Sequence, residues 1–304
     1  MLQIARTIIF VVGLLSVFCA LESSGANISW DDGGFLSKDW SHPGNWDTGL
    51  PGTIPTAGDD VFIGNLPAAL GDMTIIDQDF TIDSLSLTNG ADADTAGNVL
   101  TVAGDITVGG AGSTFTASEH NGGPNTVSVS VHDITVSTGG AYMIEGITEI
   151  DEPGAAVGTI AINSNSLFSG YGALLFREDF GGTQTVQLVN NGTFQTRRPS
   201  GASNTERFDL DLTSTPGGPN GGSRLDLDGI TENGIVDIGL MTTLDLNIRM
   251  EEFNGTMEFA PGAHLEYFSG FFAGQDAIIN VNAETALAGV PSTALFTNSA
   301  TLKS

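Results

Sequence analysis

An Asn-Gly turn followed by a short strand recurs at a regular spacing in the C-terminal half of the chain. The turns begin at Asn191, Asn233 and Asn254, so the second interval is half as long as the first. Repeating the shorter interval reaches a turn at Gln275, and repeating it once more reaches the neighbourhood of Asn298. A constant step of this kind is typical of solenoid repeats. The spacing therefore predicts a stack of coils of about 21 residues each.

Short runs of alternating side chains lie between such turns. Residues 126–131, 208–212 and 244–248 place Val, Leu, Ile or Phe on one face and Ser, Thr, Asp or Asn on the other. We find no amphipathic helix after Ala26. The pattern predicts an all-β fold, a single right-handed parallel β-helix, with an antiparallel β-sandwich as the alternative. A sandwich needs frequent two-residue hairpin loops, which do not produce a constant step.

A single coil of this length is too small to fold by itself, because its few buried side chains cannot offset the entropy lost on ordering it. Stacked coils share backbone hydrogen bonds and a continuous core, so each coil depends on its neighbours. About ten or eleven coils at a spacing of ~4.8 Å would form a rod roughly 50 Å long.

Residues 1–26 have the three zones of a secretory signal peptide. Arg6 supplies a positive charge, residues 8–18 are almost entirely apolar, and Ser24-Gly25-Ala26 offers small side chains for the peptidase. We predict a signal peptide at residues 1–26 and a secreted or cell-surface protein. No later stretch is long and apolar enough for a transmembrane helix. Cys19, the single cysteine, would leave with the signal, so the mature chain would have neither disulfides nor thiolate metal sites.

The charge of the chain is strongly unbalanced. Asp and Glu number 36 and Lys and Arg number 9, which gives a net charge of −27. The imbalance comes from the scarcity of cations, and nothing in the chain could neutralise the phosphates of a nucleic acid. Nucleic-acid binding is therefore excluded. The scattered carboxylates are interpreted as a solvated acidic surface, and a cationic partner such as calcium stays an open alternative.

The N-terminal segment of the predicted mature chain resembles a known group of proteins. Residues 30–34 read Trp-Asp-Asp-Gly-Gly, residues 45–46 read Asn-Trp, and residues 55–60 read Pro-Thr-Ala-Gly-Asp-Asp. This order is similar to the N-terminal segment of secreted bacterial parallel β-helix proteins of the autotransporter-passenger and adhesin type. The resemblance covers residues 28–110 and is compositional afterwards.

The resemblance and the repeat pattern together divide the chain into three parts. A signal peptide at 1–26 is followed by a capping segment at 27–64 and by β-helix repeats at 65–304. The chain stops at Ser304 inside a coil, without a cap. We therefore expect either a fragment or a partner molecule that covers the last coil.

All three tryptophans, Trp30, Trp40 and Trp46, lie in the capping segment. An open solenoid end exposes apolar core and unpaired strand edges, and large aromatic rings could cover it. The alternative is a binding platform on which exposed indole faces stack against sugar rings. The position at the N-terminus favours the cap.

Asp59 and Asp60 directly precede the first strand of the repeats. They are the candidate calcium ligands of the chain, but an Asp that bonds the backbone amides of the strand is the simpler interpretation. Nothing in the sequence predicts another cofactor.

Catalytic equipment is sparse in the sequence. The four histidines, His42, His120, His132 and His264, are not placed beside a Gly-x-Ser-x-Gly elbow. Arg197-Arg198 is the one adjacent basic pair that a lyase could use. The paired carboxylates Asp209 and Asp211 share a strand face, as a hydrolase would require, but we expect them on the polar outer wall.

Two classes of function follow. The leading hypothesis is a non-enzymatic extracellular or cell-surface protein, adhesin-like or structural, that presents a β surface to a polysaccharide or cell-surface ligand. The alternative is a carbohydrate-active β-helix enzyme, a polysaccharide lyase or hydrolase. Three or more charged side chains gathered in one groove would favour the enzyme, whereas a wall of Ser, Thr and Asn would favour the first hypothesis.

Overall fold

The structure is a computed structural model, and it describes most of the chain after the predicted leader. The described residues are 25–31, 37–47, 53–64, 73–123, 125–151, 157–177, 185–203, 206–215, 224–230, 233–250, 253–267, 272–273, 278–281, 296–297 and 301–302. Cys19, Gln275 and the turn at Asn298 lie outside these ranges.

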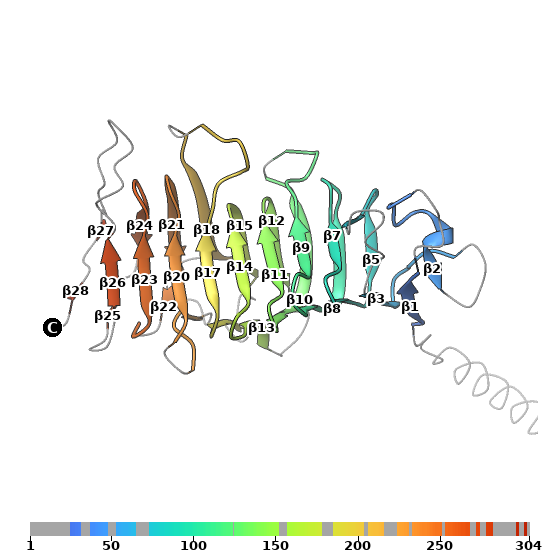
Figure 1. Cartoon of the computed structure of the whole chain (residues 1–304), viewed down its shortest axis with the longest axis horizontal. Helices are drawn as coiled ribbons and strands as arrows, with labels where there is room; N and C mark the ends of the chain where they lie inside the picture. Colours follow the sequence, from blue (N-terminus) through green and yellow to red (C-terminus); the bar gives the residue numbers. More distant parts are fainter. Residues whose placement is uncertain are drawn as a thin grey trace, which may run out of the picture.

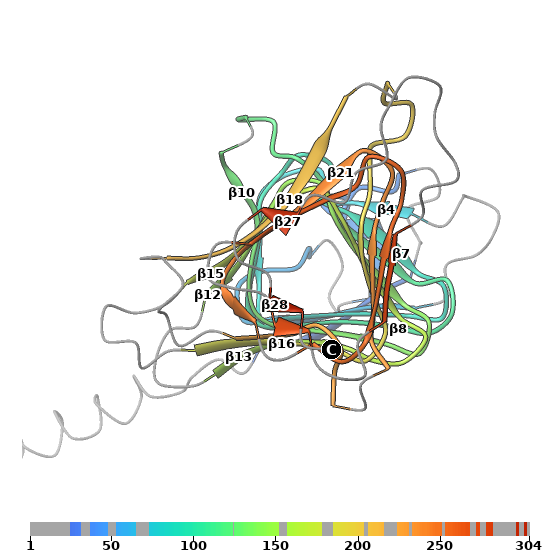
Figure 2. The ribbon, with the colours of Figure 1, turned by 90° about the vertical axis from the view of Figure 1, so that its left-hand side faces the viewer.

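The chain is a parallel β-helix. Strands from successive coils stand side by side along the long axis (Figure 1), and a view along that axis shows a three-sided coil (Figure 2). Every pairing among the described strands is parallel except that of β1 (Asn27–Trp30) with β2 (Trp46–Asp47). The predicted solenoid is confirmed, and the antiparallel sandwich is wrong. Among the described residues, no helix has the length and hydrophobicity to cross a bilayer.

Three faces, which we call A, B and C, enclose the core. Two strands, β8 (Leu100–Gly109) and β10 (Val127–Ser137), bend across the corner between faces A and B. Face A contains β1, the second halves of β8 and β10, and β3 (Asp60–Gly64), β6 (Ser84–Thr88), β13 (Val157–Ile162), β16 (Thr185–Asn190), β19 (Arg224–Asp226) and β22 (Arg249–Met250). Face B contains the first halves of β8 and β10, and β5 (Phe80–Ile82), β12 (Ile147–Asp151), β15 (Gly172–Arg177), β18 (Phe208–Thr215), β21 (Thr242–Asn247), β24 (His264–Tyr267) and β27 (Phe296–Thr297).

Face C is a separate sheet of nine strands. It contains β4 (Met73–Ile75), β7 (Asp92–Asp94), β9 (Thr114–Ala117), β11 (Ala141–Ile144), β14 (Leu167–Gly170), β17 (Thr193–Thr196), β20 (Ile235–Ile238), β23 (Thr256–Phe259) and β26 (Ile278–Val281). The remaining elements are a short 3-10 helix, η1 (Pro43–Asn45), and the pair β25 (Phe272–Ala273) and β28 (Thr301–Leu302).

The coils are not of constant length, which corrects the predicted period. Thr193 pairs directly with Ile235, so the whole interval between them is one long coil and not two short ones. The next two coils, from Ile235 to Thr256 and from Thr256 to Ile278, are about half as long and match the predicted step. Parallel pairing fixes the register of each strand but leaves the length of the corner loops free, so the corners absorb extra residues. Within the described part of the chain, face C has nine strands.

Aligned side chains fill the core in columns. On face C the rings of Phe115, Tyr142, Phe168 and Phe194 lie one above the other, with centroid separations of 5.2, 5.1 and 5.5 Å. All four are fully buried. Alternating strand residues point inward at equivalent positions of each coil, and the in-register stacking turns that alternation into continuous apolar columns.

The tryptophans close the N-terminal end of this core. Trp46 packs edge-to-face against Trp30 and Trp40, with ring centroids 4.9 and 5.3 Å apart. Nε1 of Trp40 donates a hydrogen bond to Oγ1 of Thr74 (3.1 Å), and Nε1 of Trp46 donates to the carbonyl of Trp40 (2.7 Å). Trp40 also contacts Phe80 of the first coil. The three tryptophans are at most 7% exposed. A sugar-stacking platform requires an exposed ring face, which these rings do not offer.

Candidate functional site

A groove of about 610 Å³ lies on face B, where β12, β15 and β18 are neighbours (Figure 1). We call it the acidic-aromatic groove, after the side chains that frame it. It is lined by Glu119, Asn125, Glu145, Gly146, Ile147, Tyr171, Gly172, Ala173, Leu175, Phe208, Asp209, Asp211 and Thr213.

The floor of the groove is apolar. Ile147 and Ala173 are register partners on adjacent strands and point outward, and Leu175 lies further along β15 on the same face. The backbones of two lining glycines, Gly146 and Gly172, pack closely against each other. A side chain at Gly172 would overlap the carbonyl oxygen of Gly146, and its φ of +106° is a conformation that other residues rarely adopt. Ile147, Ala173 and Leu175 therefore give the groove an apolar floor between polar walls.

Two aromatic rings stand at the edge of the floor. Tyr171 and Phe208 come from neighbouring coils and meet edge-to-face, with centroids 5.5 Å apart. Both residues are half-buried, so part of each remains accessible. Burial raises the pKa of the Tyr171 hydroxyl, and the negative charge of Glu145 adds to the shift. The hydroxyl therefore stays protonated at neutral pH and can donate a hydrogen bond to a ligand.

An ion pair spans the coil that carries Tyr171. Nη2 of Arg197 lies 2.7 Å from Oε1 of Glu145, and both side chains are about one-third exposed or less. The backbone amides of Tyr171 and Arg197 donate to the preceding coil, at Ile144 and Gly170, so these side chains occupy equivalent corner positions. Arg197, from the basic pair noted in the sequence, thus holds one carboxylate of the groove in place.

The opposite wall continues into a carboxylate ladder, which consists of Asp211, Asp245 and Glu266 on successive strands β18, β21 and β24. Burial, followed by the charges of Asp211 and Glu266, raises the pKa of Asp245 to about 6. Burial and the charge of Asp209 raise the pKa of Asp211. One oxygen of Asp245 is enclosed and accepts no hydrogen bond from a described residue. The ladder therefore contains a carboxyl group that can exchange a proton near neutral pH.

Positive charge borders the ladder on one side. Arg207 lies near His264, with Nη2 and Nε2 3.0 Å apart, and its Nη1 donates to Oγ1 of Thr243 at 3.4 Å. Burial and the Arg207 charge lower the pKa of His264. The imidazole is therefore neutral at pH 7 and accepts the guanidinium hydrogen bond.

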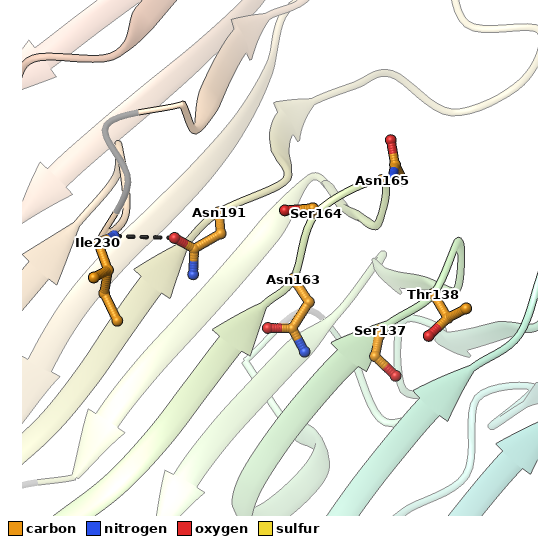
Figure 3. A pocket seen from close by; sticks show the side chains of 7 residues that line it. All are labelled: Ser137, Thr138, Asn163, Ser164, Asn165, Asn191 and Ile230. Atoms are coloured by element: carbon orange, nitrogen blue, oxygen red, sulfur yellow. Dashed lines mark hydrogen bonds between the residues drawn. The ribbon is translucent and has the colours of Figure 1, made fainter.

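A second depression, of about 550 Å³, has a different character (Figure 3). No charged side chain is among its lining residues. Ile230 is 81% exposed at its rim, and the backbone amide of Ile230 donates to Oδ1 of Asn191 at 3.0 Å. Its lining residues are Ser137, Thr138, Asn163, Ser164, Asn165, Asn191 and Ile230.

The two candidate calcium ligands have structural partners. Oδ1 of Asp59 accepts the amide of Ala26 (2.9 Å), and Oδ2 accepts the amide and the hydroxyl of Thr56 (both 2.8 Å). Asp60 accepts the hydroxyl of Ser84 at 2.5 Å. Within the described part of the chain, the group with metal-binding geometry is instead formed by Asp105, His132 and Asp133.

Sequence reasoning identified part of the acidic-aromatic groove. Asp209 and Asp211 do line the outer wall of face B, but they face a groove and not open solvent alone. Asp245, Glu266 and Tyr171 were missed. The triplet Leu-Asp-Leu at 210–212 and again at 244–246 is the signal that could have linked the first two carboxylates of the ladder.

No protein-family model, curated protein or solved structure matches the chain.

Proposed function

We propose that this protein is an extracellular carbohydrate-binding β-helix protein and that the acidic-aromatic groove holds a neutral or amino-bearing glycan. The observation that carries the proposal is the combination of Tyr171 and Phe208 with an apolar floor and carboxylate walls. Aromatic faces and apolar floors suit the C–H faces of sugar rings. Carboxylates accept hydrogen bonds from hydroxyl and ammonium groups.

Charge limits the class of glycan. Glu119, Glu145, Asp209 and Asp211 line the groove, and the chain carries a net charge of −27. A polyuronate or sulfated polysaccharide would bring like charges together, which is unfavourable. A neutral glycan avoids this repulsion, and an amino sugar gains from the negative field.

The extracellular location rests on the sequence. Residues 1–26 have the zones of a secretory signal, and no cysteine follows Cys19. The similarity of residues 28–110 to adhesin-type β-helix proteins supports a role in presenting a surface to a glycan. The uncharged depression around Asn191 is lined mostly by Ser, Thr and Asn, which is the kind of wall expected of a non-enzymatic binding protein.

Binding to a panel of soluble oligosaccharides tests the proposal. We expect neutral or amino-bearing oligosaccharides to bind and uronate oligomers to fail. Tyr171→Ala should weaken binding about tenfold, because one aromatic contact is lost. Phe62→Ala is the matched control, since Phe62 is 42% exposed on β3 outside the groove, and it should bind as the wild type does. Equal affinity of Tyr171→Ala and Phe62→Ala for the oligosaccharide, or a preference for uronate oligomers, would show that the groove is not the glycan-binding site.

Glycoside hydrolysis is a second candidate, favoured by the pKa of Asp245. A group with a pKa of about 6 can serve as a general acid, and Asp211 is its register partner on the neighbouring strand. Retaining glycosidases use two neighbouring carboxyl groups, one as the acid and one as the nucleophile, and Asp245 and Asp211 are neighbours on adjacent strands. The groove also gathers four carboxylates, and three or more charged side chains in one groove are what we expect of an enzyme.

Turnover separates the two candidates. If the groove hydrolyses its ligand, Asp245→Asn should abolish product formation and leave binding within about twofold, and the wild-type rate should fall as the pH rises through about 6. If a glycan binds and no product forms on prolonged incubation, the result favours carbohydrate binding over hydrolysis.

A further inference from the structure

A cluster of two carboxylates and one imidazole lies at the corner between faces A and B, away from the acidic-aromatic groove. Asp105 and Asp133 are register partners on β8 and β10. The register shifts at this point, because Val131 pairs with Val102 and Asp133 with Asp105, so His132 on β10 stands opposite two residues of β8, Ala103 and Gly104. The extra residue on β8 is a β-bulge that bends the pair at the corner, and the imidazole of His132 lies beside both carboxylates there.

The donor atoms have the spacing of ligands around one ion. Nδ1 of His132 lies 3.2 Å from Oδ2 of Asp133 and 3.7 Å from Oδ1 of Asp105. The three ligand atoms all lie within 4.8 Å of one another. Ligands that bind zinc at ~2.0–2.2 Å in a tetrahedron are about 3.4 Å apart. The observed separations lie on either side of that value.

Part of the cluster is fixed before any ion arrives. The second oxygen of Asp133 accepts the backbone amide of Thr159 from the next coil. This bond orients the carboxylate so that Oδ2 faces His132. The side chains of His132 and Asp133 are 26% and 28% exposed, and that of Asp105 is 61% exposed. An ion can therefore reach the cluster from solvent, and water can complete its coordination.

The donor set indicates which ion. Two carboxylates neutralise a divalent charge, and a neutral imidazole nitrogen is a ligand that zinc and similar transition ions accept readily. Calcium prefers six to eight oxygen ligands, and the cluster offers a nitrogen and two carboxylates. We propose that Asp105, His132 and Asp133 form a binding site for one divalent transition-metal ion of the zinc type.

Zinc titration of the full-length mature chain tests the site, with isothermal calorimetry in excess Mg²⁺ to suppress weak binding to other carboxylates. We expect one saturable zinc site. His132→Ala should abolish it, and Asp105→Asn should weaken it about tenfold or more. Asp105 is mostly exposed, so its substitution should leave the melting temperature unchanged and keep the test independent of folding.

A second histidine provides the control. His120 lies outside the cluster, and its Nδ1 accepts the amide of Gly122 at 2.8 Å. His120→Gln should bind zinc as the wild type does. Visible absorption of bound Co²⁺ should appear in the wild type and in His120→Gln and be absent from His132→Ala. Wild-type protein without saturable zinc binding, or His132→Ala with undiminished binding, would reduce the cluster to an ion pair of the imidazolium with its carboxylates and overturn the proposal.

Discussion

The backbone amide of Ala26 donates a hydrogen bond to Oδ1 of Asp59, at 2.9 Å. In the same corner the carbonyl of Ala26 accepts the amide of Asp60 at 3.0 Å. Asp59 is only 9% exposed, and its other oxygen accepts two bonds from Thr56. Ala26 is thus part of the folded cap, although the sequence places it as the last residue of the leader.

This relationship predicts that the position of the first residue matters for stability. A chain that begins at Ala26 keeps both bonds and gains an ammonium group opposite Asp59, whereas a chain that begins at Asn27 leaves a buried carboxylate short of a donor. We expect the shorter chain to be less stable by about 1–3 kcal/mol in urea unfolding. Asp59→Asn should reduce this difference between the two chains. Equal stability of the two wild-type chains would contradict the structural role of Ala26.

The same contact refines the predicted cleavage. Ser23 and Gly25 offer small side chains at the two positions that a signal peptidase reads, as Ser24 and Ala26 do. The signal-peptide hypothesis then predicts a mature chain that begins at Ala26. The intact mass of the secreted protein decides between the two sites, and a mass that starts at Asn27 would contradict this refinement.

The aromatic column on face C predicts large effects from single truncations. Phe168 is fully buried between Tyr142 and Phe194, and Phe168→Ala removes both stacking contacts and leaves a cavity. We expect a loss of about 3–5 kcal/mol in the free energy of unfolding. Phe62→Ala, at an exposed ring, should cost less than about 1 kcal/mol. If Phe168→Ala and Phe62→Ala lose similar amounts of unfolding free energy in chemical denaturation, the aromatic column does not stabilise the core as we expect.

Gly172 should tolerate a side chain poorly. Its φ of +106° is left-handed, and a methyl group there would overlap the Gly146 carbonyl. Gly172→Ala therefore combines backbone strain with a clash, and we expect a loss of about 2–4 kcal/mol in stability with a weakened ligand affinity of the groove. Gly123 is the matched control, because its φ is +112° and a methyl group there meets nothing within 4 Å. Gly123→Ala should cost only the strain, about 1–2 kcal/mol, and leave binding unchanged.

Asp245 predicts a specific pH dependence of stability. Its pKa of about 6 in the folded state exceeds the ~3.9 of an unfolded Asp. The folded state therefore disfavours the charged form, and the resulting cost is absent below about pH 4 and complete above about pH 6. Because the side chain is partly exposed, solvent screening reduces this cost to about 1 kcal/mol. Asp245→Asn should be more stable than the wild type by that amount at pH 7 and equal to it near pH 4. A stability difference between variant and wild type that is the same at pH 4 and pH 7 would contradict the raised pKa.

The strands and the inward-facing residues could be read from the sequence because they depend on local alternation. Leu210 and Leu212 alternate with Asp209 and Asp211, and the structure buries the first pair and turns the second outward. The length of the coils could not be read in the same way. Corner loops contribute nothing to the register, so the interval between Asn191 and Asn233 fits one long coil or two short ones equally well in the sequence.

The groove depends on which coils are neighbours, and that information is not local. Asp211 and Asp245 are distant in the sequence and become register partners because one long coil separates their strands. Tyr171 and Phe208 meet for the same reason. A repeat of constant length would have paired other side chains, so the error in the period led directly to the missed residues of the site.

The long coil between Thr193 and Ile235 shows that the rise of the stack is independent of the number of residues in each winding. Insertions at a corner lengthen the loop without displacing the side chains above and below it. New segments inserted into the corner loops of this coil can therefore change the surface around the acidic-aromatic groove, while the hydrophobic columns of the core keep their register.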